Sequence, residues 1–174
     1  RAKTPLVRYL EVPQLIRPFP VQPPLKILAA ISSPRDHLQL NVKRGRNLLQ
    51  EAVAGLQEQG LVTMEPLDRA TLPRLQEHLA RGYHILHFIG HGDFDAASNE
   101  GVLLMETEQG QSQPVTTAKM RTLLRDERAT LRLVVLNTCK GARSAAGDPF
   151  AGLAQGLIRS GIQAAIAMQF AISD

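Results

Sequence analysis

The sequence contains little cysteine and few aromatic residues. Its 174 residues include one cysteine, two tyrosines, five phenylalanines and no tryptophan. A single thiol cannot form an internal disulfide, which fits a reducing compartment, so we expect a cytoplasmic protein. The few aromatic rings leave little material for the stacking surfaces that hold single-stranded nucleic acid. The lone thiol, Cys139, is therefore the first candidate for chemistry.

Long apolar runs and blocks of like charge are also missing. No run of 18 or more apolar residues occurs, and the first residues lack the pattern of a signal peptide, so we expect no membrane association. The net charge is +4, and the 20 basic residues are spread among 16 acidic ones. We therefore expect no direct binding of nucleic acid, and we interpret the densest basic stretch, residues 43–46, as a solvated helix face.

The chain divides into a proline-rich start and a regular remainder. Six of the eleven prolines lie in residues 1–24, which predicts a linker or edge segment. From residue 25 to 174, short apolar runs alternate with amphipathic stretches, a pattern typical of an α/β domain with a mostly parallel sheet. We place strands at 25–31, 61–64, 83–89, 131–136 and 162–168, and a hairpin within 101–115. Because Asp174 follows the last strand closely, we expect the domain to continue in a longer protein.

Amphipathic stretches predict helices between these strands. The first helix carries one apolar stripe before Gly60, made of Val42, Leu48, Leu49, Ala52, Val53 and Leu56. Later helices are indicated around residues 72–79 and 120–124. The last begins at Asp148-Pro149, where an N-cap residue is followed by a proline at the first helical position.

Two reactive side chains follow two of the predicted parallel strands. His91 comes after the strand at 83–89, and Cys139 comes after the strand at 131–136. Because the carboxyl ends of parallel strands meet at one edge of a sheet, we expect the imidazole and the thiol to approach each other. The imidazole can take the thiol proton, and the thiolate can then attack a carbonyl carbon. The amides of Gly92 and Cys139 are candidates for the oxyanion hole, and Asn137 is a candidate for the substrate pocket.

The segment Asn137-Thr138-Cys139-Lys140-Gly141 resembles the caspase element that holds the nucleophile. Caspases place their histidine about 50 residues upstream, and His91 precedes Cys139 by 48 positions. Residues 83–92, 133–139 and 148–150 are more specifically similar to CHAT domains, which are caspase-like modules often fused to bacterial sensor or repeat regions. The likeness covers residues 25–174.

The resemblance implies a caspase-like three-layer sandwich, with helices on both faces of the sheet, and hydrolysis of protein or peptide substrates by His91 and Cys139. It also implies control by sensor or repeat domains in the same chain or a partner chain, and no cofactor. Asn137 stands where caspases have a glutamine that helps select aspartate, so that specificity is not implied. In caspases the loop after the first strand helps line the substrate pocket, which makes Ser33, Arg35 and Asp36 weak candidates.

Other histidines and acidic residues have simpler interpretations. Along the strand at 83–89, His84 and His87 point to opposite faces, and we interpret both as packed core residues. A zinc site formed by His87, His91 and Cys139 matches no familiar ligand spacing, so we expect no metal. We interpret His37 and His78 as surface residues. Asp93 and the neighbouring Asp95 either orient the substrate or His91, or form a turn.

Two competing functions belong to different classes. Tyrosine phosphatases also have a cysteine after a parallel strand, but they need an arginine six positions later, where this chain has Ala145. The other alternative is a domain that keeps the fold and binds a partner without cleaving it. The His/Cys pair favours catalysis over this alternative, and labelling of the thiol distinguishes the two.

Overall fold

The computed structural model describes residues 22–95, 100–140 and 149–167. Its elements follow the order β1 (Leu25–Ile31), α1 (Val42–Glu58), β2 (Val62–Asp68), α2 (Leu72–Leu79), β3 (Ile85–Asp95), β4 (Glu100–Glu106), β5 (Ser112–Thr116), α3 (Thr117–Leu124), the 3-10 helix η1 (Asp126–Ala129), β6 (Leu133–Lys140), α4 (Pro149–Arg159) and β7 (Ala164–Ala167). The predicted strands, helices and hairpin all have counterparts here.

The strands of the described residues form one seven-stranded sheet. Five of them lie side by side in the order β2-β1-β3-β6-β7, and every neighbouring pair among these five is parallel. The hairpin of β4 and β5 continues the sheet beyond the end of β1, because β4 pairs antiparallel with the second half of β3. The predicted α/β fold with a mostly parallel sheet is therefore confirmed.

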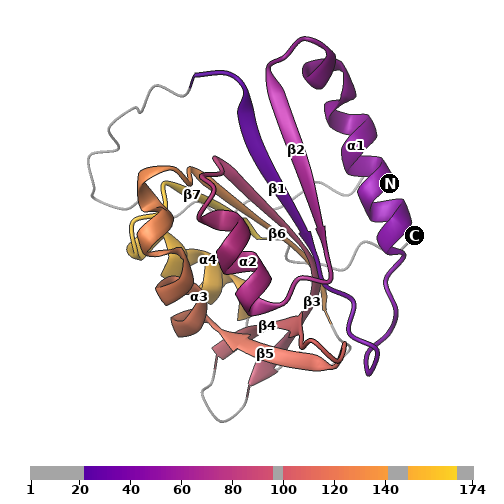
Figure 1. The fold of residues 1–174 in the computed structure, drawn as a ribbon. Coiled ribbons are helices and arrows are strands. Elements are labelled where there is room, and N and C mark those ends of the chain that lie inside the picture. Colours follow the sequence, from indigo (N-terminus) through magenta and orange to yellow (C-terminus); the bar gives the residue numbers. More distant parts are fainter. Residues whose placement is uncertain (1–21, 96–99, 141–148, 168–174) are drawn as a thin grey trace, which may run out of the picture.

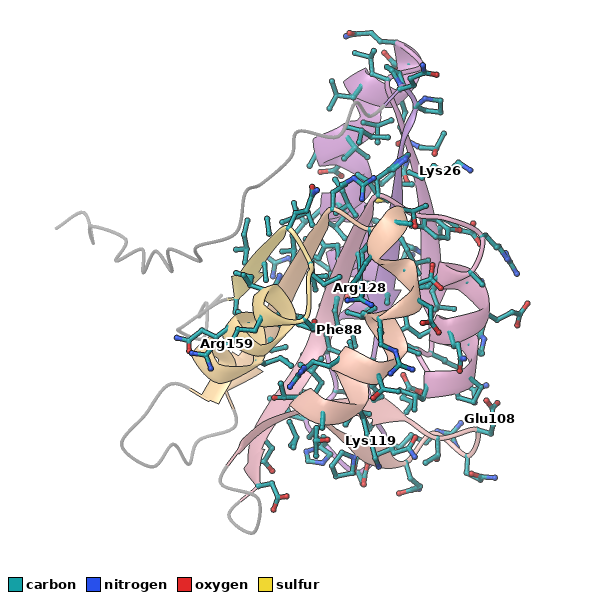
Figure 2. All side chains as sticks on the ribbon, turned by 90° about the vertical axis from the view of Figure 1, so that its left-hand side faces the viewer. Lys26, Phe88, Glu108, Lys119, Arg128 and Arg159 are labelled. Atoms are coloured by element: carbon teal, nitrogen blue, oxygen red, sulfur yellow. The ribbon has the colours of Figure 1, made fainter. Side chains whose placement is uncertain are left out.

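Helices cover both faces of this sheet. Figure 1 shows α2, α3 and α4 on one side and α1 on the other, so the sheet is the middle of three layers. The strands send alternate apolar side chains toward α2, α3 and α4, and the most deeply buried of these are Leu28, Ala30, Leu86, Phe88, Val134 and Leu136. Figure 2 shows Phe88 near the middle of the molecule, with Lys26 toward one end and Glu108 toward the other. This core holds the strands that carry the candidate site.

Helix α1 packs differently from its prediction. It begins after Asn41, whose side chain accepts a hydrogen bond from the Arg44 N–H, as expected of an N-cap. None of its residues is buried, and Leu48 and Leu56 keep 56% and 44% of their surface exposed. The helix approaches the sheet at Gly45, where a Cβ would lie 3.7 Å from Ile89 Cδ1. The predicted single apolar stripe was therefore wrong at Leu48 and Leu56.

Two strands extend further than the sequence indicates. We predicted that His91 and Cys139 follow their strands, but β3 continues to Asp95 and β6 to Lys140. The extension has a physical cause, since β4 and β6 supply hydrogen-bonding partners on both edges of residues 91–92. His91 and Cys139 thus lie within paired strands, which places their backbones more firmly than loops would.

Candidate active site

The backbones of His91 and Cys139 are direct neighbours in the sheet. The two residues are Cα partners in the parallel register of β3 and β6, and the next pair is Gly92 with Lys140. On its other edge, β3 places His91 opposite Leu104 of β4. The sheet therefore brings together the two positions that the sequence singles out.

The ring of His91 is fixed by a backbone carbonyl. His91 is 7% exposed, and its Nε2 lies 2.6 Å from the carbonyl oxygen of Leu38. A carbonyl oxygen can only accept a hydrogen bond, so Nε2 must carry the proton. In the neutral ring, Nδ1 is then the nitrogen with a free lone pair. Nδ1 can therefore accept a proton from another group.

Leu38 belongs to the β1–α1 loop, residues 32–41, which lies against His91. The ring of His37 in the same loop is 5.8 Å from the His91 ring, centre to centre, at a tilt of 32°. The start of the loop is tied to the sheet, because buried Ser32 donates from its Oγ to the carbonyl of Leu104 at 2.9 Å. This packing leaves His37 half-buried, so it is not a fully solvent-facing surface residue.

The loop candidates Ser33, Arg35 and Asp36 face the β4–β5 hairpin. The carboxylate of Asp36 accepts hydrogen bonds from Ser112 N at 2.8 Å and from Ser112 Oγ at 2.7 Å. The hydrogen bond from the Ser112 side chain lowers the pKa of Asp36 below its ordinary value. Arg35 is exposed, and its backbone N–H donates to the Gly110 carbonyl at 2.9 Å. These contacts attach the loop that covers His91 to the hairpin.

The remaining candidates lie on β3 and β6. Asn137 is half-buried and pairs with Ile89, Gly92 is buried, and Asp93 is exposed opposite Val102 of β4. Gly141, Ala145 and the predicted N-cap Asp148 lie outside the described residues. The structure thus places the described candidates on the adjacent strands β3 and β6 and in the β1–α1 loop, which contacts His91 of β3.

Gly90 allows β3 to pass close to the core. A Cβ at this position would lie 2.7 Å from Cε1 and 2.8 Å from Cζ of Phe88, and 3.3 Å from the Ser32 carbonyl. Real Cβ atoms do not approach other atoms this closely, so a side chain at residue 90 would displace the Phe88 ring. The glycine before His91 is therefore required by packing on the strand.

The other histidines of β3 have different surroundings. His84 precedes the strand, where its Nδ1 accepts a hydrogen bond from the Lys26 N–H at 2.9 Å in an exposed position. Its interpretation as a core residue was wrong. Burial lowers the pKa of His87 below its ordinary value, and its Nε2 is buried without a hydrogen-bond partner. His87 is therefore neutral at neutral pH, which suits a packed residue.

His78, the other predicted surface histidine, is half-buried. Its Nδ1 lies 2.8 Å from the Arg74 carbonyl, and its Nε2 lies 3.4 Å from Glu65. These contacts belong to α2 and β2. Across residues 22–95, 100–140 and 149–167, no three His, Cys, Asp or Glu side chains are grouped closely enough to hold a metal ion.

Two contributors to this site were missed by sequence reasoning. Leu38 contributes its backbone carbonyl, which any residue could supply, so its side chain gives no signal. Glu106 is only 5% exposed and accepts a hydrogen bond from the Ser33 N–H at 2.9 Å. A possible signal for Glu106 was an acidic residue at the end of the apolar run Val102-Leu103-Leu104-Met105.

Comparison with known families identifies the family of the chain. The family model described as CHAT domain matches residues 15–174, which is most of the chain. The chain belongs to the CHAT domain family. This confirms the resemblance seen in the sequence and places the CHAT domain among caspase-like, peptidase-related proteins. No curated protein matches the sequence.

Among the helices that the structure describes, none is long and apolar enough to cross a membrane.

Proposed function

We propose that this CHAT domain is a cysteine endopeptidase in which His91 and Cys139 act as a catalytic dyad. The observation that carries the proposal is the register of β3 and β6, which makes the two residues Cα partners. Because partners in a parallel ladder share a face of the sheet, we propose that the imidazole of His91 lies within reach of the Cys139 thiol. The Leu38 contact supports the same proposal, because it leaves Nδ1 of His91 as the proton acceptor.

The proposed reaction proceeds through an acyl-enzyme. Nδ1 of His91 takes the proton from the Cys139 thiol, and the thiolate attacks the carbonyl carbon of the scissile peptide bond. The C–N bond then breaks, and the departing amine takes the proton from the His91 imidazolium. Water next attacks the thioester carbon and loses a proton to His91, the C–S bond breaks to release the carboxylic acid product, and the Cys139 thiolate takes the proton back from the His91 imidazolium.

We assign supporting roles to the residues around the dyad. The amides of Gly92 and Cys139 are proposed to donate to the oxyanion, and Asn137 is proposed to line the substrate pocket. Ser33, Arg35, Asp36 and Asp93 are proposed to border the same pocket. Ser33, Arg35 and Asp36 belong to the same loop as Leu38, whose carbonyl contacts His91, and this contact supports their proposed place at the pocket.

The proposal extends to regulation and location. We propose that sensor or repeat domains, in the same chain or in a partner chain, control access to the dyad. A protein or peptide is the proposed substrate. A single cysteine and no internal disulfide suit catalysis in a reducing cytoplasm, where a thiolate nucleophile stays reduced.

Labelling of Cys139 by a peptide-based electrophile tests the dyad. At pH 7 an ordinary thiol with a pKa of about 8.5 is roughly 3% ionised. Pairing with an imidazole raises the thiolate fraction toward completion, although the less basic thiolate is also less nucleophilic. We therefore expect His91→Ala to slow labelling at pH 7 by about tenfold, measured by intact-protein mass spectrometry.

The chain offers useful controls for this experiment. Cys139 is the only cysteine, so every thiol adduct reports on the proposed nucleophile. His84→Ala removes a histidine at the opposite end of the parallel strands and should label at the rate of the natural sequence. At pH 9.5, where thiols ionise without help, the rates of all three proteins should converge. Equal rates for the natural sequence and His91→Ala at pH 7 would support the non-catalytic scaffold instead.

A further inference from the structure

Glu106 is a buried carboxylate at the end of β4. It is 5% exposed, and among the residues that the structure describes it is the only carboxylate buried to this degree. Acidic residues are seldom buried without partners. Its Oε1 accepts the Ser33 N–H at 2.9 Å, and its Oε2 lies 3.9 Å from Nε of Arg69. The carboxylate therefore contacts Ser33 of the β1–α1 loop and Arg69, which lies between β2 and α2.

Ser33 closes that loop on itself. Its Oγ accepts a hydrogen bond from the Leu40 N–H at 3.0 Å, which joins the two ends of the segment that carries Leu38. Inside the closed segment, Nε2 of Gln39 donates to the carbonyl of Pro34 at 2.7 Å. Besides the hairpin contacts of Arg35 and Asp36, the position of the Leu38 carbonyl thus depends on Ser33, which in turn is held by Glu106.

Much of the segment between Ser33 and Leu40 is exposed, although Pro34 is buried and His37 packs against His91. Leu38 keeps 84% of its surface exposed, and Arg35, Asp36 and Gln39 are also exposed. Hydrogen bonds therefore contribute, together with the packing of Pro34 and His37, to keeping the Leu38 carbonyl against His91. The bond from Ser33 to Glu106 ends on buried β4 at the loop closure, beside the bond from Ser32 to Leu104, while Asp36 and Arg35 attach the middle of the loop to the hairpin.

We infer that Glu106 is a positioning residue for His91, an inference that rests on the proposed dyad. Glu106 holds Ser33, Ser33 closes the loop, and the Leu38 carbonyl then keeps the His91 proton on Nε2. This leaves Nδ1 free to take the thiol proton. Loss of the Glu106 acceptor frees the loop, so the imidazole spends more time in the wrong tautomer or orientation.

Paired substitutions of Glu106 test this chain of contacts. Glu106→Gln keeps a side-chain oxygen that can accept the Ser33 N–H, whereas Glu106→Ala removes it. At pH 7 we expect iodoacetamide to label Cys139 about tenfold more slowly in Glu106→Ala, and within about twofold of the natural rate in Glu106→Gln. At pH 9.5 the rates should converge. Glu77→Ala, an exposed carboxylate on α2, is the matched control and should label normally.

A second readout separates this inference from the dyad itself. Long-range proton–nitrogen NMR spectra report the tautomer of His91, whose signal is assigned by its loss in His91→Ala. We expect the Nε2–H form in the natural sequence and in Glu106→Gln, and a mixture of tautomers in Glu106→Ala. The positioning role would be overturned if Glu106→Ala labelled Cys139 at the natural rate and kept the Nε2–H tautomer. It would also be overturned if Glu106→Ala and Glu106→Gln slowed labelling equally. If His91→Ala itself labels normally, the dyad fails and the tautomer spectra still decide whether Glu106 orients the ring.

Discussion

Replacing Cys139 with alanine is expected to abolish peptide cleavage by the CHAT domain. Without the thiol no acyl-enzyme can form, and nothing else near His91 on the described strands supplies an equivalent sulfur nucleophile. His91→Ala keeps the nucleophile but loses the proton acceptor, so we expect kcat/KM to fall by about 10²- to 10⁴-fold, the range typical of general-base removal. Digestion of a proteome-derived peptide library by the full-length, activated protein measures both effects through the new termini that appear.

A matched histidine variant controls this comparison. His84 lies before β3 and bonds to the backbone of Lys26, at the end of the parallel strands opposite His91. His84→Ala should therefore cleave the library as the natural sequence does. Unchanged cleavage by Cys139→Ala would mean that the hydrolysis comes from another group or another protein.

Replacing Phe88 with alanine is expected to lower the free energy of unfolding by about 3–5 kcal/mol. Phe88 has no exposed surface and is among the largest fully buried side chains of the described residues. Its ring also packs against Gly90, so its removal leaves a cavity beside the strand that carries His91. Chemical denaturation measures the loss of stability, provided that the m-values of the variant and the natural sequence are the same.

A conservative change at the same position provides the comparison. Phe88→Leu keeps much of the buried volume, so we expect a smaller loss, below about 2 kcal/mol. If Phe88→Ala destabilises the protein by less than about 1 kcal/mol, the core on the α2, α3 and α4 side of the sheet does not hold β3 as described. Because a typical domain is stable by only about 5–15 kcal/mol, Phe88→Ala should be handled at low temperature.

Local sequence patterns were enough to predict the elements of the sheet. The apolar run 25–31 coincides with β1 because Ser32-Ser33-Pro34 ends it. The apolar run 131–136 likewise overlaps the start of β6. The adjacency of positions 91 and 139 in the sheet was also expected, since parallel strands end on one side of a sheet. The strand positions depend on residues close together in the chain, whereas this adjacency follows from the general geometry of parallel sheets.

Features that depend on distant partners were not predictable. Gly90 and Gly92 made the region after residue 89 resemble a turn, and only pairing with β4 and β6 shows it to be strand. Leu48 and Leu56 fit an apolar stripe, yet their exposure depends on where α1 rests on the sheet. Glu106 was not among the candidates from the sequence, because its role depends on a hydrogen bond from Ser33, 73 positions away.

The ultraviolet absorbance of the Cys139 thiolate, followed from pH 4 to pH 10, tests the dyad most directly. Subtracting the titration of Cys139→Ala removes the contribution of the two tyrosines, so the difference reports on the single cysteine, and the titration needs neither a substrate nor an activating partner. We expect thiolate absorbance already at pH 6.5 in the natural sequence, well below the ordinary thiol midpoint of about 8.5. In His91→Ala the midpoint should return toward that ordinary value. Superimposable titration curves for the two proteins would contradict the pairing of His91 with Cys139.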